Sequence, residues 1–167
     1  FKKYDCGIVW GDTTITHKNS NKIKRFYSGK FDPVKCFDYG IMPPHPSVFV
    51  KKEIYDNHGY FNTKYRISSD YELLLRFLKE KKISAKYLEE NLAFMQHGGI
   101  SSGSISDILE VNNQVNQINK LYGIQPNFIR FLFKIIIRLL ERIKLPDCRK
   151  YLMSFFLKLE SRYQAHL

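Results

Sequence analysis

The residues best suited to chemistry in this chain lie around Asp70, where a short extended segment runs into a helix. In the stretch 66–77, Ser69 and Glu72 have the S-x-x-E spacing of a capping box, so we expect Ser69 to be the helix N-cap. Asp70 would then take the first helical position with a free side chain, and the positive end of the helix would keep its carboxylate ionised. An oriented, ionised carboxylate suits a general base. The alternative is that Asp70 only complements the helix dipole, as acidic residues in first turns usually do.

The helix that must position Asp70 shows the spacing of a buried stripe. Four apolar side chains follow the i, i+1, i+4, i+5 pattern: Leu73, Leu74, Phe77 and Leu78. Three aromatic residues precede the helix, and we interpret them as core side chains that pack the turn and do no chemistry: Tyr60, Phe61 and Tyr65. The sequence therefore predicts a rigid support for Asp70.

An ordered set of segments around this helix resembles the second half of a bacterial family 2 glycosyltransferase, a family with the GT-A fold. The matching segments are Val9-Trp-Gly-Asp12, His45-Pro-Ser-Val-Phe49, Ser69-Asp-Tyr-Glu-Leu-Leu-Leu-Arg76 and Leu92-Ala-Phe-Met-Gln-His-Gly-Gly-Ile-Ser-Ser102. They resemble the family's Val-Tyr-Gly-Asp strand end, its His-x-Ser-x-Phe strand, its (Glu/Ala/Ser)-Asp-Tyr-(Asp/Glu)-Leu-x-Leu-Arg helix and its Gly-Gly-(Ile/Val)-Ser segment. The resemblance implies that Asp70 is the catalytic base, which favours this role over the dipole interpretation.

Six further residues are candidate substrate contacts in the light of this resemblance: His45, Ser47, Ser69, His97, Gly98 and Gly99. The prolines of 42–46 stiffen the chain around His45 and would allow a cis peptide bond. The alternative for His45 is a turn histidine bonded to backbone. Adjacent glycines let backbone amides approach a phosphate or sugar, although a simple turn would also explain them. In some GT-A enzymes a histidine from this later region helps to bind the metal–diphosphate, which is the role considered for His97.

Composition and charge describe a folded protein with an anionic partner. The 167 residues are 44% hydrophobic and 15% aromatic, enough for one domain or for a subdomain with an appendage. The net charge of +11 implies affinity for nucleotide phosphates, anionic lipid or nucleic acid. Residues 124–167 hold nine lysines and arginines and three acidic residues, which gives six of the eleven net charges.

The cysteines and the start of the sequence favour a cytoplasmic location. Cys6, Cys36 and Cys148 are widely spaced and odd in number, which is typical of reduced thiols and not of a disulfide framework or a zinc site. Phe1 leads directly into an expected strand, so we expect no signal peptide. No stretch reaches the ~18 apolar residues that a membrane span needs.

Periodicity predicts a mixture of strands and helices along the chain. We expect strands at 4–10, 13–16, 22–27, 47–50, 83–88 and 91–96, a loop at 31–40, and helices at 51–57 and 107–122. Gly59 and Gly123 would end the two helices. An apolar seam on the second helix comprises Ile108, Val111, Val115, Ile118 and Tyr122.

The expected hairpin at 13–27 alternates basic and aromatic residues. Such a pattern could bind nucleic acid, because bases stack on aromatic rings between cations. We favour lysines that face solvent and protect an edge strand, and we therefore expect no nucleic-acid partner.

The C-terminal region is strongly amphipathic. Residues 127–144 carry a basic arc opposite a wide apolar face, and a second helix follows the turn at Pro146-Asp147. The two helices could fold onto the main domain as a hairpin, or their apolar face could lie in a membrane interface while the cations meet anionic headgroups. We slightly favour contact with the cytoplasmic membrane.

The sequence lacks the donor-side motifs that the resemblance implies. It contains no Asp-x-Asp motif, so the Mg²⁺ or Mn²⁺ and the nucleotide-sugar donor of the complete enzyme would be bound elsewhere, and we expect this chain to be an inactive fragment. The absence of a Gln-x-x-Arg-Trp segment favours a single-addition transferase over a processive synthase.

We therefore predict an α/β protein. Residues 1–104 would form the acceptor-side half of a GT-A-type nucleotide-diphospho-sugar transferase, and residues 105–167 the C-terminal helices, which end in the amphipathic hairpin and could associate with a membrane surface. The expected function is inverting sugar transfer from a nucleotide sugar to a saccharide or lipid-linked acceptor in bacterial surface polysaccharide synthesis. The alternative is a non-catalytic membrane-surface or scaffold module.

Overall fold

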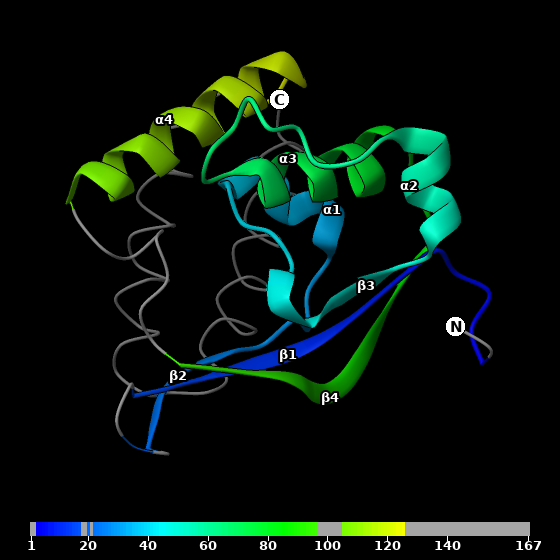
Figure 1. Cartoon of the computed structure of the whole chain (residues 1–167). Coiled ribbons are helices and arrows are strands. Elements are labelled where there is room, and N and C mark those ends of the chain that lie inside the picture. Colours follow the sequence, from blue (N-terminus) through cyan, green and yellow to red (C-terminus); the bar gives the residue numbers. More distant parts are fainter. Residues whose placement is uncertain (1–2, 18–19, 21, 97–104, 126–167) are drawn as a thin grey trace, which may run out of the picture.

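The computed structural model describes residues 3–17, 20, 22–96 and 105–125, which form a mixed α/β structure (Figure 1). The strands are β1 (Ile8–Thr16), β2 (Ile23–Tyr27), β3 (Val48–Val50) and β4 (Ala85–Gln96). The helices are α1 (Pro33–Cys36), α2 (Lys52–His58), α3 (Ser69–Leu75) and α4 (Ile105–Leu121). Two short 3-10 turns, η1 (Phe37–Tyr39) and η2 (His45–Ser47), follow α1 and precede β3, and a π-helical turn, η3 (Arg76–Glu80), continues α3. The predicted α/β class is confirmed.

Strand β1 is the centre of a four-stranded mixed sheet. β4 runs parallel to β1 along its whole length, from Ile8 to Thr16. β3 pairs antiparallel with the first part of β1, and β2 pairs antiparallel with its last part. Since β4 occupies one edge of β1 throughout, β2 and β3 share the other edge. The predicted hairpin between 13–16 and 22–27 is confirmed.

We expected one strand to end at Trp10 and another at Leu88. Both ends were wrong, because the two strands continue there through a bulge. β1 continues through Gly11-Asp12 to Thr16, and most of the segment 83–88 joins 91–96 in one strand, β4, which begins at Ala85. The register between β1 and β4 shifts on both sides of Asp12. A Cβ on Gly11 would lie 2.5 Å from the carbonyl oxygen of Glu90, so glycine permits this close approach.

Asp12 has a structural role within this bulge. Its side chain is buried, and Oδ1 accepts hydrogen bonds from the Gly29 amide at 2.7 Å and from the Tyr87 hydroxyl at 2.8 Å. The carboxylate thereby ties the segment after β2 to β1 and β4.

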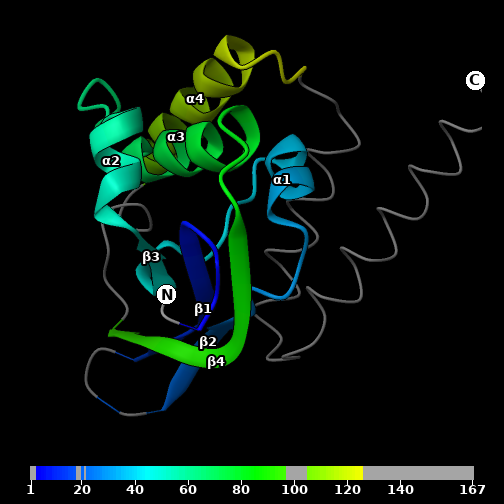
Figure 2. The same cartoon turned by 90° about the vertical axis from the view of Figure 1, so that its right-hand side faces the viewer.

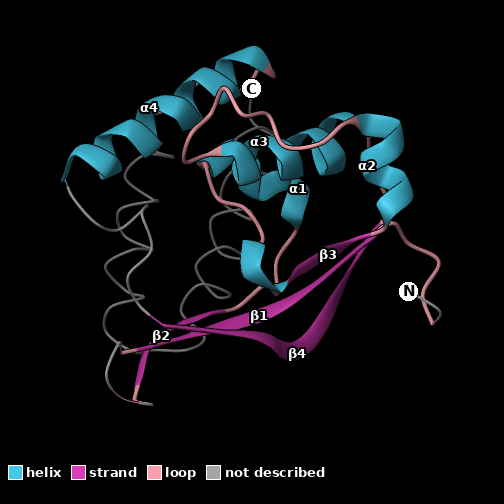
Figure 3. Cartoon of the chain, viewed as in Figure 1, coloured by secondary structure: helices cyan, strands magenta, loops and turns pink. Residues whose placement is uncertain are grey.

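The four described helices lie on one side of the sheet, as Figures 1 and 3 show. The apolar stripe predicted for α3 is confirmed, because its four residues are all at most 3% exposed: Leu73, Leu74, Phe77 and Leu78. They belong to one hydrophobic cluster with Ile8 of β1 and Phe37 of η1. α3 is therefore the buried central helix of this layer.

Helix α4 packs on α3 and shares the same core, as Figure 2 shows from a second side. Val115 and Ile118 are buried, and Val111 and Tyr122 pack against the cluster, which confirms these members of the predicted seam. Gly123 follows the helix with φ +70°, in agreement with its predicted role as terminator.

Three local predictions differ from the structure. The expected loop at 31–40 contains α1 and η1, because Asp32 caps the amides of Val34 and Lys35 and Pro33 begins the helix. Tyr60 and Phe61, which we expected in the core, are exposed, whereas Tyr65 is buried. No cis peptide bond occurs in the described chain, including the proline-rich segment at 42–46.

Other predictions agree with the structure or lie outside its described part. Helix α2 ends at Gly59, which has φ +85° and donates its amide to the Tyr55 carbonyl. Cys6 and Cys36 are buried, and neither is part of a disulfide within the described residues. None of the helices among the described residues has the length and apolar character of a membrane span. Cys148, most of the Gly-Gly segment and the C-terminal helices at 127–163 fall outside the described residues.

Candidate functional site

Asp70 lies in the first turn of α3, but the cap of this helix differs from the prediction. The N-cap is Ser68 and not Ser69, and neither hydroxyl caps the helix. Ser69 is the first helical residue and Asp70 the second. The amides of Ile67 and Ser68 instead donate to Oε1 of Gln114 on α4, at 3.1 and 3.0 Å. The predicted capping box was wrong because a side chain from another helix provides the acceptor.

Glu72, the expected partner in the capping box, points into a buried cluster. Its carboxylate accepts hydrogen bonds from Nε of Arg76 at 2.9 Å and from the hydroxyl of Tyr122 at 2.6 Å. Glu72 therefore links α3 to the end of α4. The first turn of α3 contains two acidic residues, and Asp70 is the one that does not bind Arg76.

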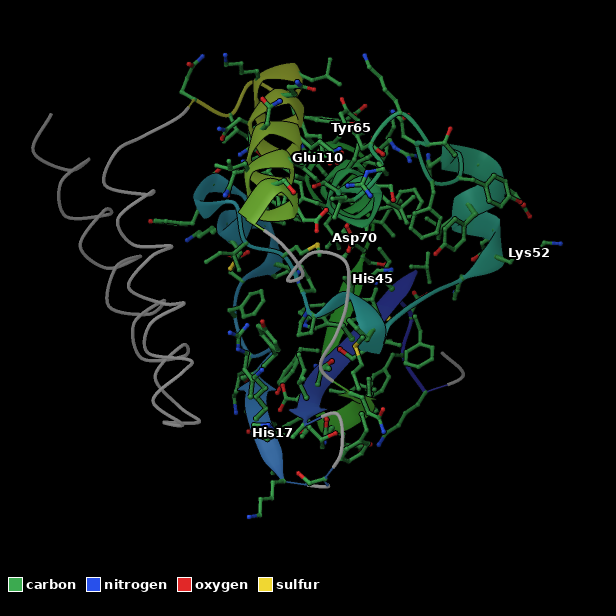
Figure 4. The ribbon with its side chains drawn as sticks, turned by 60° about the vertical axis from the view of Figure 1, so that its left-hand side comes forward. His17, His45, Lys52, Tyr65, Asp70 and Glu110 are labelled. Carbon is green, nitrogen blue, oxygen red and sulfur yellow. The ribbon has the colours of Figure 1, made fainter. Side chains whose placement is uncertain are left out.

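The carboxylate of Asp70 faces the imidazole of His45 across the space between α3 and η2 (Figure 4). Oδ2 of Asp70 lies 3.9 Å from Nδ1 of His45, and Oδ1 accepts the amide of Tyr71 at 2.8 Å. The Asp70 side chain is 27% exposed and that of His45 44% exposed. Among the described residues, no lysine or arginine forms an ion pair with Asp70. The carboxylate is thus oriented and still accessible to a ligand.

The environment of Asp70 favours its protonated form more than water does. Burial raises the pKa of this carboxyl above its ordinary value of 3.8, while the charge of His45 and the amides of Tyr71 and Asp70 act in the opposite direction. From the sequence we expected the positive end of the helix to dominate the pKa of Asp70, whereas in the structure burial has the larger effect. A carboxylate with a raised pKa binds a transferred proton more firmly, which suits a general base.

His45 is held in place by the turn that contains it. Ser47 is fully buried, and its hydroxyl lies 2.7 Å from the carbonyl oxygen of Gly11 and 2.8 Å from that of Pro44. The Ser47 amide also donates to Pro44. This hydroxyl is therefore engaged with backbone and positions η2, and we assign Ser47 no direct contact with a ligand. His45 itself projects from the fixed turn toward Asp70.

The structure brings together two of the predicted site residues and adds one that the sequence analysis missed. Asp70 and His45 form the pair, and Ser69 adjoins it as a half-buried residue. His97, Gly98 and Gly99 lie outside the described residues. The missed residue is Phe61, whose ring centroid lies 6.3 Å from that of His45 in an edge-on arrangement. The only signal in the sequence was that Phe61 stands in a polar stretch, four residues before Tyr65.

The described residues do not provide a metal site that would fit the ion implied by the family resemblance. No group of three or more His, Cys, Asp or Glu side chains within them could hold a metal ion. Asp70 and His45 make a pair, which is fewer ligands than a protein site for Mg²⁺ or Mn²⁺ normally uses. We therefore place no metal ion at this pair.

Comparisons of the chain with protein-family models, with curated proteins and with solved structures gave no match.

Proposed function

We propose that this chain is the acceptor-binding part of an inverting glycosyltransferase that resembles family 2 enzymes of the GT-A fold. The observation that carries the proposal is the pair of Asp70 and His45, in which an oriented, accessible carboxylate with a raised pKa faces an imidazole. The order of the motifs from Val9 to Ser102 supports the same class.

The reaction we propose is a single displacement at the anomeric carbon of a nucleotide sugar. A hydroxyl oxygen of the acceptor attacks that carbon and forms the new glycosidic bond, while the bond to the nucleoside diphosphate breaks on the opposite face. Asp70 takes the proton of the attacking hydroxyl, and His45 contacts the acceptor beside it. Base assistance of this kind typically contributes about 10²- to 10⁴-fold to a rate.

The proposal assigns donor and metal binding to residues outside these 167, because the sequence has no Asp-x-Asp motif. The proposed acceptor is a saccharide or a lipid-linked saccharide of a bacterial surface polysaccharide. The proposed location is the cytoplasmic side of the membrane, where such an acceptor is accessible and where the basic C-terminal region could meet anionic lipid.

Acceptor-dependent release of nucleoside diphosphate tests this function. The complete gene product would be incubated with UDP-, GDP- and dTDP-sugars, with and without saccharide and lipid-linked acceptors, and the released diphosphate measured. We expect release that requires both substrates and a product with inverted anomeric configuration. A complete product that binds donor and acceptor but releases no diphosphate would contradict the proposal and favour the scaffold alternative.

A further inference from the structure

Three aromatic rings form a continuous surface beside the pair of Asp70 and His45. Tyr60 and Phe61 are 61% and 43% exposed, although both are large apolar side chains. The ring of Tyr55 stacks on that of Tyr60 at 5.7 Å and lies 6.3 Å from that of Phe61. Phe61 in turn meets His45. The aromatic surface of Tyr55, Tyr60 and Phe61 therefore ends at His45, whose imidazole faces the proposed catalytic carboxylate.

Contacts from below hold Tyr55, Tyr60 and the backbone that leads to Phe61. The largely buried guanidinium of Arg76 donates to three successive carbonyls, those of His58, Gly59 and Tyr60, the last two at 3.2 and 2.8 Å. Tyr60 also donates its hydroxyl to Asp56, and Tyr55 packs edge-on against the buried Phe77 at 5.5 Å. Exposed aromatic rings that are fixed in this way lose little conformational entropy when a ligand covers them.

We infer that the aromatic surface is the subsite for a sugar ring of the acceptor, so that one ring hydroxyl reaches Asp70 and His45. The inference rests on the proposed function and adds the place where a sugar ring of the acceptor binds. The face of an aromatic ring carries partial negative charge and attracts the polarised C–H groups on the apolar face of a pyranose. The polar edge of the same sugar carries hydroxyls, which match the carboxylate and the imidazole at the end of the surface.

A hydrocarbon chain fits this place less well than a sugar. A lipid tail over Phe61 would also cover His45 and Asp70, and it offers no hydrogen bond to either polar group. Burial of polar groups without partners costs free energy. The aromatic surface and the polar pair together favour a ligand with one apolar and one hydroxylated side.

Saturation-transfer NMR and titration with simple glycosides test the subsite without any need for turnover. The probes are the methyl β-glycosides of glucose, galactose and N-acetylglucosamine, with 1-hexanol as the hydrocarbon probe, added to the complete protein. We expect saturation on the C–H protons of one sugar face and a Phe61→Ala affinity loss of roughly two- to tenfold. Phe61→Tyr keeps the ring and should bind as wild type does. Phe94→Ala removes a strongly exposed phenylalanine on β4 and should change nothing.

Three results would overturn the subsite: no binding of any glycoside, an unchanged affinity in Phe61→Ala, or binding of 1-hexanol alone. Failure of the proposed function is seen separately. If Asp70→Asn retains full transfer while Phe61→Ala weakens the glycosides, the subsite stands and the base is wrong. If Asp70→Asn abolishes transfer while Phe61→Ala leaves the KM for acceptor unchanged, the base stands and the subsite is wrong.

Discussion

The side-chain oxygen of Gln114 on α4 lies 3.0 Å from the backbone nitrogen of Ser68 and accepts its hydrogen bond. The same oxygen accepts the amide of Ile67 at 3.1 Å. A side chain of the neighbouring helix therefore accepts the two amides that precede α3, while Asp70 itself accepts the amide of Tyr71 in the first turn. Gln114 thus connects the packing of α4 to the position of the candidate base.

Replacement of Gln114 by alanine should destabilise the protein by roughly 1–3 kcal/mol, because two buried or partly buried amides lose their acceptor. The free energy of unfolding measured in urea checks this value. Gln117→Ala is the matched control, since Gln117 is exposed on the same helix and should have little effect. Equal stability of the Gln114→Ala protein and wild type would show that this cap does not stabilise α3.

Arg76 should matter more for stability than any single surface charge. Its ion pair with Glu72 is largely buried, so Arg76→Ala leaves the Glu72 carboxylate without its cation and should cost about 3–5 kcal/mol. The double variant Glu72→Leu/Arg76→Met should recover part of this loss, because it removes both charges but leaves the carbonyls of residues 58–60 and the Tyr122 hydroxyl without these partners. Denaturant unfolding of the three proteins checks the prediction. Arg66→Ala breaks an exposed ion pair with Glu110 and should change stability far less. A loss in Arg66→Ala as large as in Arg76→Ala would contradict the assignment.

The raised pKa of Asp70 predicts a pH-dependent cost in stability. Because the folded protein binds this proton more tightly than the unfolded chain, Asp70 reduces stability as the pH rises from its ordinary value of 3.8 through the raised value. Asp70→Asn removes this titration and can still accept the Tyr71 amide. We therefore expect the variant to be more stable than wild type at pH 7, with a difference that shrinks toward pH 3. Thermal unfolding at the two pH values measures it, and a stability difference that grows toward pH 3 would have the wrong sign.

Local sequence patterns were sufficient for the elements whose signals are local. The stripe Leu73 to Leu78 predicted the buried face of α3, and Gly59 predicted the end of α2, because the periodicity and the positive φ are properties of the segment itself. The hairpin of β1 and β2 follows from two short apolar runs around a polar turn in the same way.

The features that decide the site depend on contacts between distant segments. The S-x-x-E pattern at Ser69 was a valid local signal, but Gln114 supplies the cap and Arg76 takes Glu72, and both facts require the packing of α3 to be known. The exposure of Phe61 was also hidden, since an aromatic residue in a turn is usually core. His45 and Asp70 were each named as site residues in the light of the family resemblance, but their mutual distance of 3.9 Å could not be predicted from the sequence.

The rate of sugar transfer by Asp70→Asn, measured in the complete protein, tests the role of Asp70 most directly. The substitution keeps the shape of the side chain and removes the proposed base, so we predict a fall in kcat of about 10²- to 10⁴-fold with the affinity for the nucleotide sugar within twofold of wild type. Asp5→Asn, at an exposed aspartate before β1, serves as the control and should transfer at the wild-type rate. An Asp70→Asn protein that transfers sugar within a few-fold of the wild-type rate would contradict the account.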